Sequence, residues 1–283
     1  MSKQKTLSLF ASVLFVAVFS VMLMSCGNES NDENKDETQT ADVSSAVEKV
    51  DKLVYPLPTP LEVTNMLNKA GASYILDVAN PPGNVDKYFT EMSKAMNLGV
   101  YGADLSYAST YNKTQETNNY LACTLKLRDG LSVETPYNAT LLDEVEANID
   151  NKDTLYEILT SSFHDTFEFL NENGKGAVSV MILAGGWIEG LYISTELAML
   201  TDNNAEILKG IADQKETLKT LIPLIETYKD NENIVLILKE LKVIEAIFAE
   251  LPEKDGAVQL NEEQFGKIKD EIEALRKKVV ETT

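Results

Sequence analysis

The sequence is poor in the residues that carry most acid–base and metal chemistry. It has one histidine, His164, and two cysteines, Cys26 and Cys123, among 283 residues. A lone histidine excludes most catalytic triads, and the two cysteines do not have the spacing of a zinc motif. A glycine-rich phosphate loop followed by lysine and a serine elbow are both missing. We therefore expect no metal and no cofactor, and an enzyme is a less favoured reading.

Basic residues are also scarce. The chain has 25 lysines and arginines against 45 aspartates and glutamates, a formal net charge of -20. An acidic surface of this size repels nucleic acid and anionic lipid headgroups. We expect no nucleic-acid partner, and attachment to a membrane would need a lipid rather than a basic patch.

The start of the chain indicates export. Lys3 and Lys5 precede an apolar run over residues 7–24, which is the pattern of a signal peptide. The run ends in LMSC (residues 23–26), which resembles the lipobox of bacterial lipoproteins. This resemblance covers residues 1–26. It implies cleavage before Cys26, lipid on Cys26 and anchoring in the outer membrane, on its periplasmic face or at the cell surface. A membrane span is the alternative, but the run is short for one and contains three serines.

Three parts of the chain are expected. Residues 1–25 are the signal peptide, and residues 26–46 are an acidic tether without large apolar residues before Val43. A tether of this composition cannot bury enough apolar surface to offset its ordering entropy, so we expect it to be disordered. Residues 47–283 are long enough for one sizeable domain. Within it, Cys123 lies between apolar neighbours and is expected to be buried.

Helix signals recur through the domain, and strand signals hardly appear. The pattern predicts an all-α fold, a single multi-helix bundle. The predicted helices run over residues 60–70, 85–98, 100–128 with a break near Asn112, 153–172, 175–200, 205–228, 234–251 and 262–280.

Two of these helices have distinctive faces. Residues 175–200 are apolar nearly all round, which predicts a helix buried at the centre of the bundle. Glu189, Glu196 and the interior glycines Gly185, Gly186 and Gly190 within that stretch argue against a membrane span. The last helix carries a narrow apolar seam that predicts packing against neighbouring helices. The seam comprises Phe265, Ile268, Ile272, Leu275 and Val279.

Two segments could form a site, residues 99–112 and 184–197. They combine glycines with aromatic and acidic residues, and helical spacing puts many of these on one stripe of each helix. If the two helices pack together, a few polar groups would converge between apolar helices, as in many small-molecule sites. The hypothesis is a site for a cationic or hydroxyl-rich ligand. Its residues are Asp104, Tyr107, Tyr111, Trp187, Glu189, Tyr192 and Glu196.

A structural reading of the same residues stays open. The glycines would then only allow close helix packing, and the carboxylates and phenols would satisfy one another or the backbone. The two segments resemble uncharacterised helical lipoproteins of the Bacteroidota, a resemblance that implies no activity. His164 and Glu168 form a one-turn pair, which we interpret as a solvated helix face rather than a metal site.

Three functions remain at this point. The favoured one is a non-catalytic, membrane-anchored binding or accessory module. The second is an assembly component of an envelope complex, with the seam of the last helix as its partner surface. The third is an enzyme that acts on glycans through two carboxylates, which would have to lie about 5 to 9 Å apart across an open cleft. A cavity beside Trp187 would favour ligand binding, and an exposed apolar patch would favour assembly.

Overall fold

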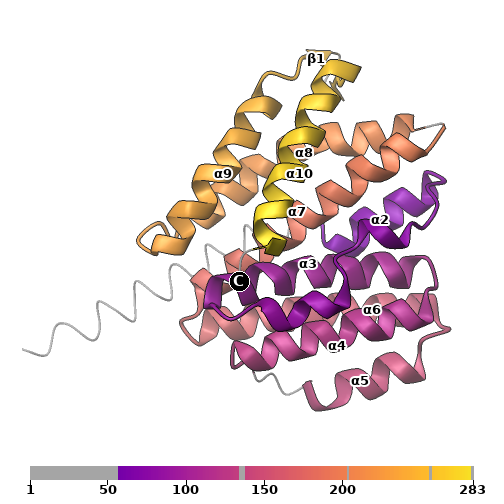
Figure 1. Ribbon diagram of the computed structural model, residues 1–283, viewed down its shortest axis with the longest axis vertical. Helices are drawn as coiled ribbons and strands as arrows, with labels where there is room; N and C mark the ends of the chain where they lie inside the picture. Colours follow the sequence, from indigo (N-terminus) through magenta and orange to yellow (C-terminus); the bar gives the residue numbers. More distant parts are fainter. Residues whose placement is uncertain (1–56, 134–137, 203, 255–256, 282–283) are drawn as a thin grey trace, which may run out of the picture. The chain divides into compact units, whose positions relative to one another are not determined.

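The computed structural model describes residues 57–133, 138–202, 204–254 and 257–281. The predicted signal peptide, the predicted lipidation site Cys26 and the predicted tether lie outside these residues. In the described part the all-α prediction is confirmed. The helices, shown in Figure 1, are α2 (Pro60–Lys69), α3 (Glu91–Thr110), α4 (Thr114–Gly130), α5 (Asn138–Ala147), α6 (Lys152–Glu172), α7 (Gly176–Leu200), α8 (Ala205–Glu226), α9 (Glu232–Ala249) and α10 (Glu262–Glu281).

Short elements connect these helices. Two 3₁₀ helices, η1 (Leu76–Val78) and η2 (Pro82–Lys87), lie between α2 and α3. Strands β1 (Glu253–Lys254) and β2 (Ala257–Val258) pair antiparallel between α9 and α10.

Side-chain caps set several helix starts. Thr59 and Glu62 form the predicted capping box of α2: Glu62 N donates to Thr59 Oγ1 at 3.2 Å, and Thr59 N donates to Glu62 Oε2 at 2.7 Å. Asn261 and Gln264 exchange the same two bonds at the start of α10, at 2.9 and 3.1 Å. These pairs satisfy N–H groups that a helix start leaves without partners.

The prediction of a helix over residues 85–98 is wrong at both ends. The predicted start at residue 85 lies inside the 3₁₀ helix η2, which ends at Lys87. Helix α3 starts only at Glu91, after a capping box between Thr90 and Ser93. The helix then continues through Gly99 instead of ending there. The break near Asn112 is confirmed, because Asn112 has a φ of 55° between α3 and α4. Helix α5 has no counterpart among the predicted helices.

Helix α7 is the centre of the bundle, as predicted. It packs against α2, α3, α6, α8, α9 and α10. In the part of the chain that the structure describes it is the one helix long and apolar enough to cross a membrane, and 83% of its most apolar window is buried by its neighbours. Its apolar circumference therefore faces protein.

The backbones of helices α3 and α7 are in direct contact. A Cβ atom on Gly99 would lie 2.0 Å from the carbonyl oxygen of Ile182. One on Gly185 would lie 2.0 Å from the carbonyl oxygen of Met96. Glycine is needed at both positions because any side chain would overlap main-chain atoms, and the resulting close contact fixes the register of the two helices.

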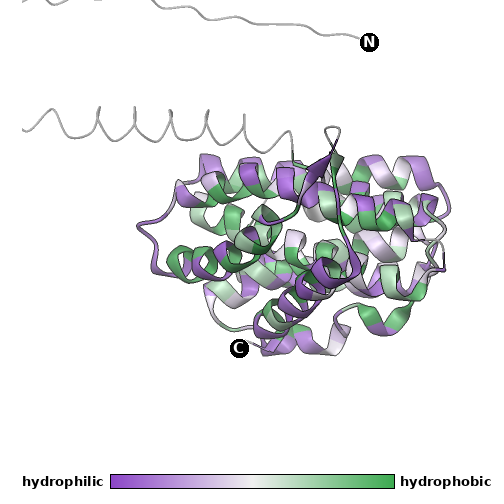
Figure 2. Ribbon diagram, turned by 90° about the horizontal axis from the view of Figure 1, so that it is seen from above, coloured by the Kyte–Doolittle hydropathy of each residue, from purple (hydrophilic) through white to green (hydrophobic). Residues whose placement is uncertain are grey.

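The seam of α10 is buried against the domain, as its spacing predicts. All five seam residues are buried, and α10 packs on α3, α7 and α9. In Figure 2 most helices alternate between hydrophilic and hydrophobic residues, the pattern of amphipathic helices around a common core. The seam is therefore not available as a partner surface.

Candidate functional site

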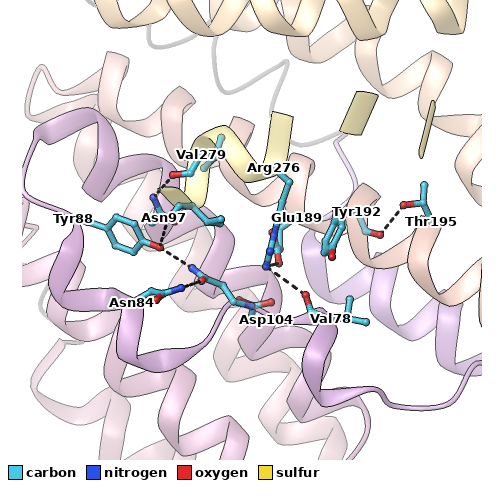
Figure 3. A network of polar contacts seen from close by, with 12 residues as sticks. Val78, Asn84, Tyr88, Asn97, Asp104, Glu189, Tyr192, Thr195, Arg276 and Val279 are labelled. Atoms are coloured by element: carbon cyan, nitrogen blue, oxygen red, sulfur yellow. Dashed lines mark hydrogen bonds and ion pairs between the residues drawn. The ribbon is translucent and has the colours of Figure 1, made fainter. Parts of the chain in front are cut away.

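The close contact of α3 and α7 brings Asp104 and Glu189 together in the interior. Both side chains are 0% exposed. Arg276 reaches Glu189 from α10 and makes two hydrogen bonds, Nε to Oε2 at 2.9 Å and Nη2 to Oε1 at 3.0 Å (Figure 3). This bidentate geometry is the strong form of a carboxylate–guanidinium pair. Three helices are therefore joined by one buried polar cluster.

The protonation state of Asp104 is set mainly by its burial and by the neighbouring Glu189. Its Oδ2 accepts from Asn80 N at 3.1 Å, whereas Oδ1 receives no N–H or hydroxyl donor among the described residues. Burial, followed by the charge of Glu189, raises the pKa of Asp104 well above its ordinary value. The two carboxyl groups are also within hydrogen-bonding reach. The arrangement fits a protonated Asp104 that donates to Glu189.

Glu189 is the member that keeps the negative charge. Burial raises the pKa of Glu189, but the charge and hydrogen bonds of Arg276 act in the opposite direction. Burial likewise opposes the charge of Arg276, and the pair with Glu189 outweighs this and raises the pKa of Arg276 above its usual range. The cluster is then one cation, one anion and one neutral acid. Its net charge is zero, which limits the cost of burying it.

Further contacts hold the guanidinium in place. The ring of Tyr192 lies 4.5 Å from the Arg276 guanidinium carbon, in a cation–π contact. The carbonyl of Val78 accepts a longer hydrogen bond from Nη2 at 3.4 Å. Little of the charged group is left for a ligand to contact.

Hydrogen bonds also join the last turn of α10 to residues near this cluster. Asn97 Nδ2 donates to the carbonyl of Val279 at 3.0 Å, and the Tyr88 hydroxyl donates to that of Val280 at 3.2 Å. Asn80 Nδ2 in turn donates to Tyr88 at 3.0 Å. These bonds satisfy carbonyls that a helix end leaves free, so the cluster and the end of α10 form one structural unit.

A neutral Asp104 makes stability depend on pH. An unfolded aspartate loses its proton near pH 4, whereas native Asp104 keeps it at higher pH, so the folded state binds more protons. The free energy of unfolding therefore falls as the pH rises from about 4 toward the raised pKa, by up to about 1.4 kcal/mol per pH unit. Asp104→Asn should remove this slope with little loss of stability at pH 7.

The measurement is urea unfolding between pH 4 and pH 8, with Asp86→Asn as a surface control. Asp86 is an exposed partner of Lys126, so its substitution controls for the loss of one carboxylate at the surface. A large loss of stability in Asp104→Asn at pH 7 would show instead that the ionised carboxylate is required.

Two of the three tyrosines predicted for the site, Tyr107 and Tyr111, belong to a separate aromatic cluster, whereas Tyr192 contacts Arg276. The ring centroid of Tyr107 lies 4.6 Å from that of Tyr74 and 5.1 Å from that of Tyr111. The Tyr107 hydroxyl accepts from Ile75 N at 2.7 Å. Burial raises the pKa of Tyr111 to about 12. This cluster packs the segment after α2 against α3.

Glu196 forms an ion pair at the edge of the bundle. Lys269 Nζ lies 2.8 Å from Glu196 Oε1 and 3.1 Å from Glu273 Oε2. These are ion pairs between α7 and α10 and within α10. The predicted acidic stripe is thus divided between an interior cluster and a surface ion pair, and the structure does not bring it into one ligand pocket.

Trp187 alone among the predicted site residues lies on a different face of α7, where it lines an apolar groove. We call this the Trp187 groove. Trp187 is half-buried, and its Nε1 donates to Gln214 Oε1 at 2.9 Å. The groove encloses a cavity of about 50 Å³ between the start of α2 and helices α6, α7 and α8. Its apolar walls include Leu57, Val63, Met66, Phe163, Leu183 and Leu191.

A second apolar cavity of about 80 Å³ adjoins the groove. Thr59, Pro60 and Phe163 line both cavities. In the wall of the second cavity Thr160 Oγ1 is buried without a hydrogen-bond partner among the described residues. The two cavities therefore share part of their walls.

The side chains of His164 and Cys123 are both at least partly buried in the bundle. His164 is half-buried, with its ring 5.8 Å from that of Phe163, and it lines the groove. The expectation of a solvated face was therefore wrong for His164, although Glu168 is exposed. Cys123 is buried as predicted, and burial raises the pKa of its thiol to about 11. In the described ranges no three His, Cys, Asp or Glu side chains come together as a metal site.

Arg276 is the important residue that the sequence interpretation missed. In the sequence it stands beside Lys277 and Lys278, and basic residues at a helix end are explained by the helix dipole alone. Its position next to Leu275 and four residues after Ile272 places it at the edge of the buried seam. A buried Glu189 needs a cation, and this edge position is the signal that could have identified it.

Comparison with protein-family models, curated proteins and solved structures finds no significant match to this chain. The function is therefore argued from the chain's own residues.

Proposed function

We propose that this chain is a non-catalytic binding module of the cell envelope, attached to the outer membrane by lipid on Cys26. In this proposal the Trp187 groove binds an apolar group of a small ligand. The lipid anchor follows from the lipobox resemblance of residues 23–26. Ligand binding rests on the cavity in the groove, which lies beside the chain's only tryptophan.

The groove favours a different ligand from the one that the sequence suggested. Asp104 and Glu189 satisfy each other and Arg276, so they offer no free charge to a cationic ligand. The groove is lined mainly by apolar groups, which suit hydrophobic transfer. Together the two adjoining cavities approach the volume of about 150 Å³ at which a dry cavity in another protein takes up benzene. We infer that one ring or a short aliphatic chain enters.

Titration with the neutral apolar probe N-phenylnaphthylamine tests this proposal. The titration would use residues 26–283 with Cys26→Ser. Trp187 is the only tryptophan in the sequence, so energy transfer from tryptophan to the probe reports binding near Trp187. We expect saturable energy transfer, and we expect Gly190→Leu to abolish it by filling the groove. A Cβ atom on Gly190 would have its nearest neighbour, a Val63 methyl, at 4.0 Å.

Gly266→Leu is the matched control. Gly266 lies on α10 in open space, so this variant adds the same side chain away from the groove and should bind as the parent does. Equal energy transfer in Gly190→Leu and the parent would contradict the proposal.

Assembly into an envelope complex is the second candidate. Val235, Leu236 and Val243 of α9 are 45–56% exposed. Leu236 also lines a groove of about 200 Å³ between α9, α10 and the start of α3. Exposed apolar side chains next to a groove are typical of protein contacts. Crosslinked pull-down from outer membranes, with Leu236→Glu as the variant, would show whether a stoichiometric partner depends on this face.

The glycan-hydrolase alternative loses its structural basis. It needs two carboxylates across an open cleft, and Asp104 and Glu189 are both closed off from solvent. We do not propose it.

A further inference from the structure

A polar cleft lies between α2, the end of α3 and the starts of α6 and α8. It consists of two hollows of about 550 and 250 Å³. Asn65, Lys69 and Tyr156 line both hollows, so the two meet at these side chains. We call the two hollows together the Asn65 cleft. The larger hollow alone is within the usual range of small-molecule sites, about 300–1,000 Å³.

The Asn65 cleft adjoins the Trp187 groove. Met66 of α2 lines both spaces. On α8 the lining residues follow one face of the helix, from Glu206 in the cleft to Gly210 and Gln214 in the groove, at steps of four residues. Helix α2 packs against both α7 and α8. The groove and the cleft are therefore neighbours along α2 and α8, and one ligand can contact both.

Two polar side chains of the cleft are free to bind a ligand. Asn65 and Tyr156 are half-buried, and in the part of the chain that the structure describes neither side chain makes a hydrogen bond or an ion pair. In the groove, by contrast, the Trp187 indole N–H already donates to Gln214. An amide and a phenol can each donate and accept. A hydroxyl group does both as well, so hydroxyl groups are suitable partners for this pair.

Charges of both signs line the cleft. They come from Lys69 and Lys152 and from Glu62, Asp153 and Glu206. Glu62 is engaged in the capping box of α2, which leaves two lysines and two carboxylates in the described lining. A balanced set of this kind does not favour a ligand of one charge. The cleft therefore fits a head group that is polar but carries no net charge.

We propose that the ligand of the Trp187 groove is a neutral amphiphile, such as an alkyl glycoside, whose hydroxyl-bearing head lies in the Asn65 cleft. The apolar chain occupies the groove and passes Met66, and hydroxyl groups of the head bond to Asn65 and Tyr156. The inference rests on the proposed function, because burial of the chain in the groove supplies the hydrophobic part of the affinity. The cleft supplies polar contacts that select the head group.

The test is an NMR titration of ¹⁵N-labelled residues 26–283 with Cys26→Ser, using octyl glucoside below its micelle concentration. The side-chain amide signal of Asn65 reports on the cleft, and the indole signal of Trp187 reports on the groove. Octyl glucoside should shift both signals. The comparison compound is 1-octanol, which has the same chain without the sugar and should shift only the Trp187 signal.

Asn65→Ala/Tyr156→Phe removes both hydrogen-bonding groups. It should weaken octyl glucoside binding, followed by the Trp187 signal, about tenfold, the effect of one or two net hydrogen bonds. Binding of 1-octanol should not change, which also shows that the variant is folded around the groove. Asn119→Ala is the control, because Asn119 is exposed on α4, outside the lining of the cleft. It should bind octyl glucoside as the parent does.

The two signals separate this inference from the proposed function. Equal octyl glucoside affinity in the parent and in Asn65→Ala/Tyr156→Phe overturns the inference and leaves the groove as a site for apolar groups. A Trp187 signal that shifts with none of octyl glucoside, 1-octanol and N-phenylnaphthylamine overturns the proposed function. If the Asn65 signal still shifts with octyl glucoside in that case, the cleft is a separate site for the sugar, and the amphiphile spanning both spaces is overturned.

Discussion

Gly185→Ala is expected to destabilise the protein by about 3 kcal/mol or more, the upper end of the cost of overpacking a core. The new Cβ atom would lie 2.0 Å from the carbonyl oxygen of Met96, and a main-chain atom in the middle of α3 cannot rotate away as a side chain can. Relief requires α3 and α7 to separate. That separation would loosen the packing that brings Asp104 next to Glu189.

Gly102→Ala supplies the control for this prediction. Gly102 is also in α3, but a Cβ atom there meets nothing within 4 Å. Alanine has the higher helix propensity, so this variant should gain about 0.5–1 kcal/mol. Urea unfolding of both variants gives the comparison. Similar stabilities for Gly185→Ala and Gly102→Ala would show that the two helices are not in backbone contact.

Arg276→Met should cost about 3–5 kcal/mol at neutral pH, the usual result of removing one partner of a buried ion pair. Methionine keeps much of the apolar stem of the side chain but leaves Glu189 charged and unpaired in the interior. The cost should shrink as the pH falls, because Glu189 can then take up a proton. Adding Glu189→Gln to Arg276→Met should recover part of the loss.

Lys278→Met is the control for Arg276→Met. Lys278 lies on the same helix as Arg276 and pairs with Glu240 of α9 at 2.6 Å, but its side chain is 59% exposed. Exposed pairs contribute about 0–1 kcal/mol, so this variant should change stability little. Equal losses in the two variants would contradict the special role of the buried cluster.

Much of the architecture could be predicted from the sequence because it depends on local patterns. The apolar circumference of residues 175–200 predicted a central helix, and the three-four spacing of the last helix predicted its buried face. Helix starts were less certain where the cap was unusual. The Thr90–Ser93 box pairs two hydroxyl residues without the usual Glu or Gln, so the start of α3 was placed too early.

The candidate site was only partly predictable, because its organisation depends on tertiary partners. Helical spacing correctly grouped Asp104 and Glu189 on facing stripes. It could not show that Arg276, 87 residues further along the chain than Glu189, neutralises them. Nor could it show that Trp187 faces away from this cluster, since its groove is formed by α2, α6 and α8 together.

The central claim is that the acidic cluster is structural and that ligand binding belongs to the Trp187 groove. The most direct test follows the single indole N–H signal of Trp187 by NMR in ¹⁵N-labelled residues 26–283 with Cys26→Ser. Titration with N-phenylnaphthylamine should shift this signal, and titration with a cationic, hydroxyl-rich compound such as glucosamine should not. A shift with glucosamine alone, lost in Glu189→Gln, would contradict the claim and return the site to the acidic stripe.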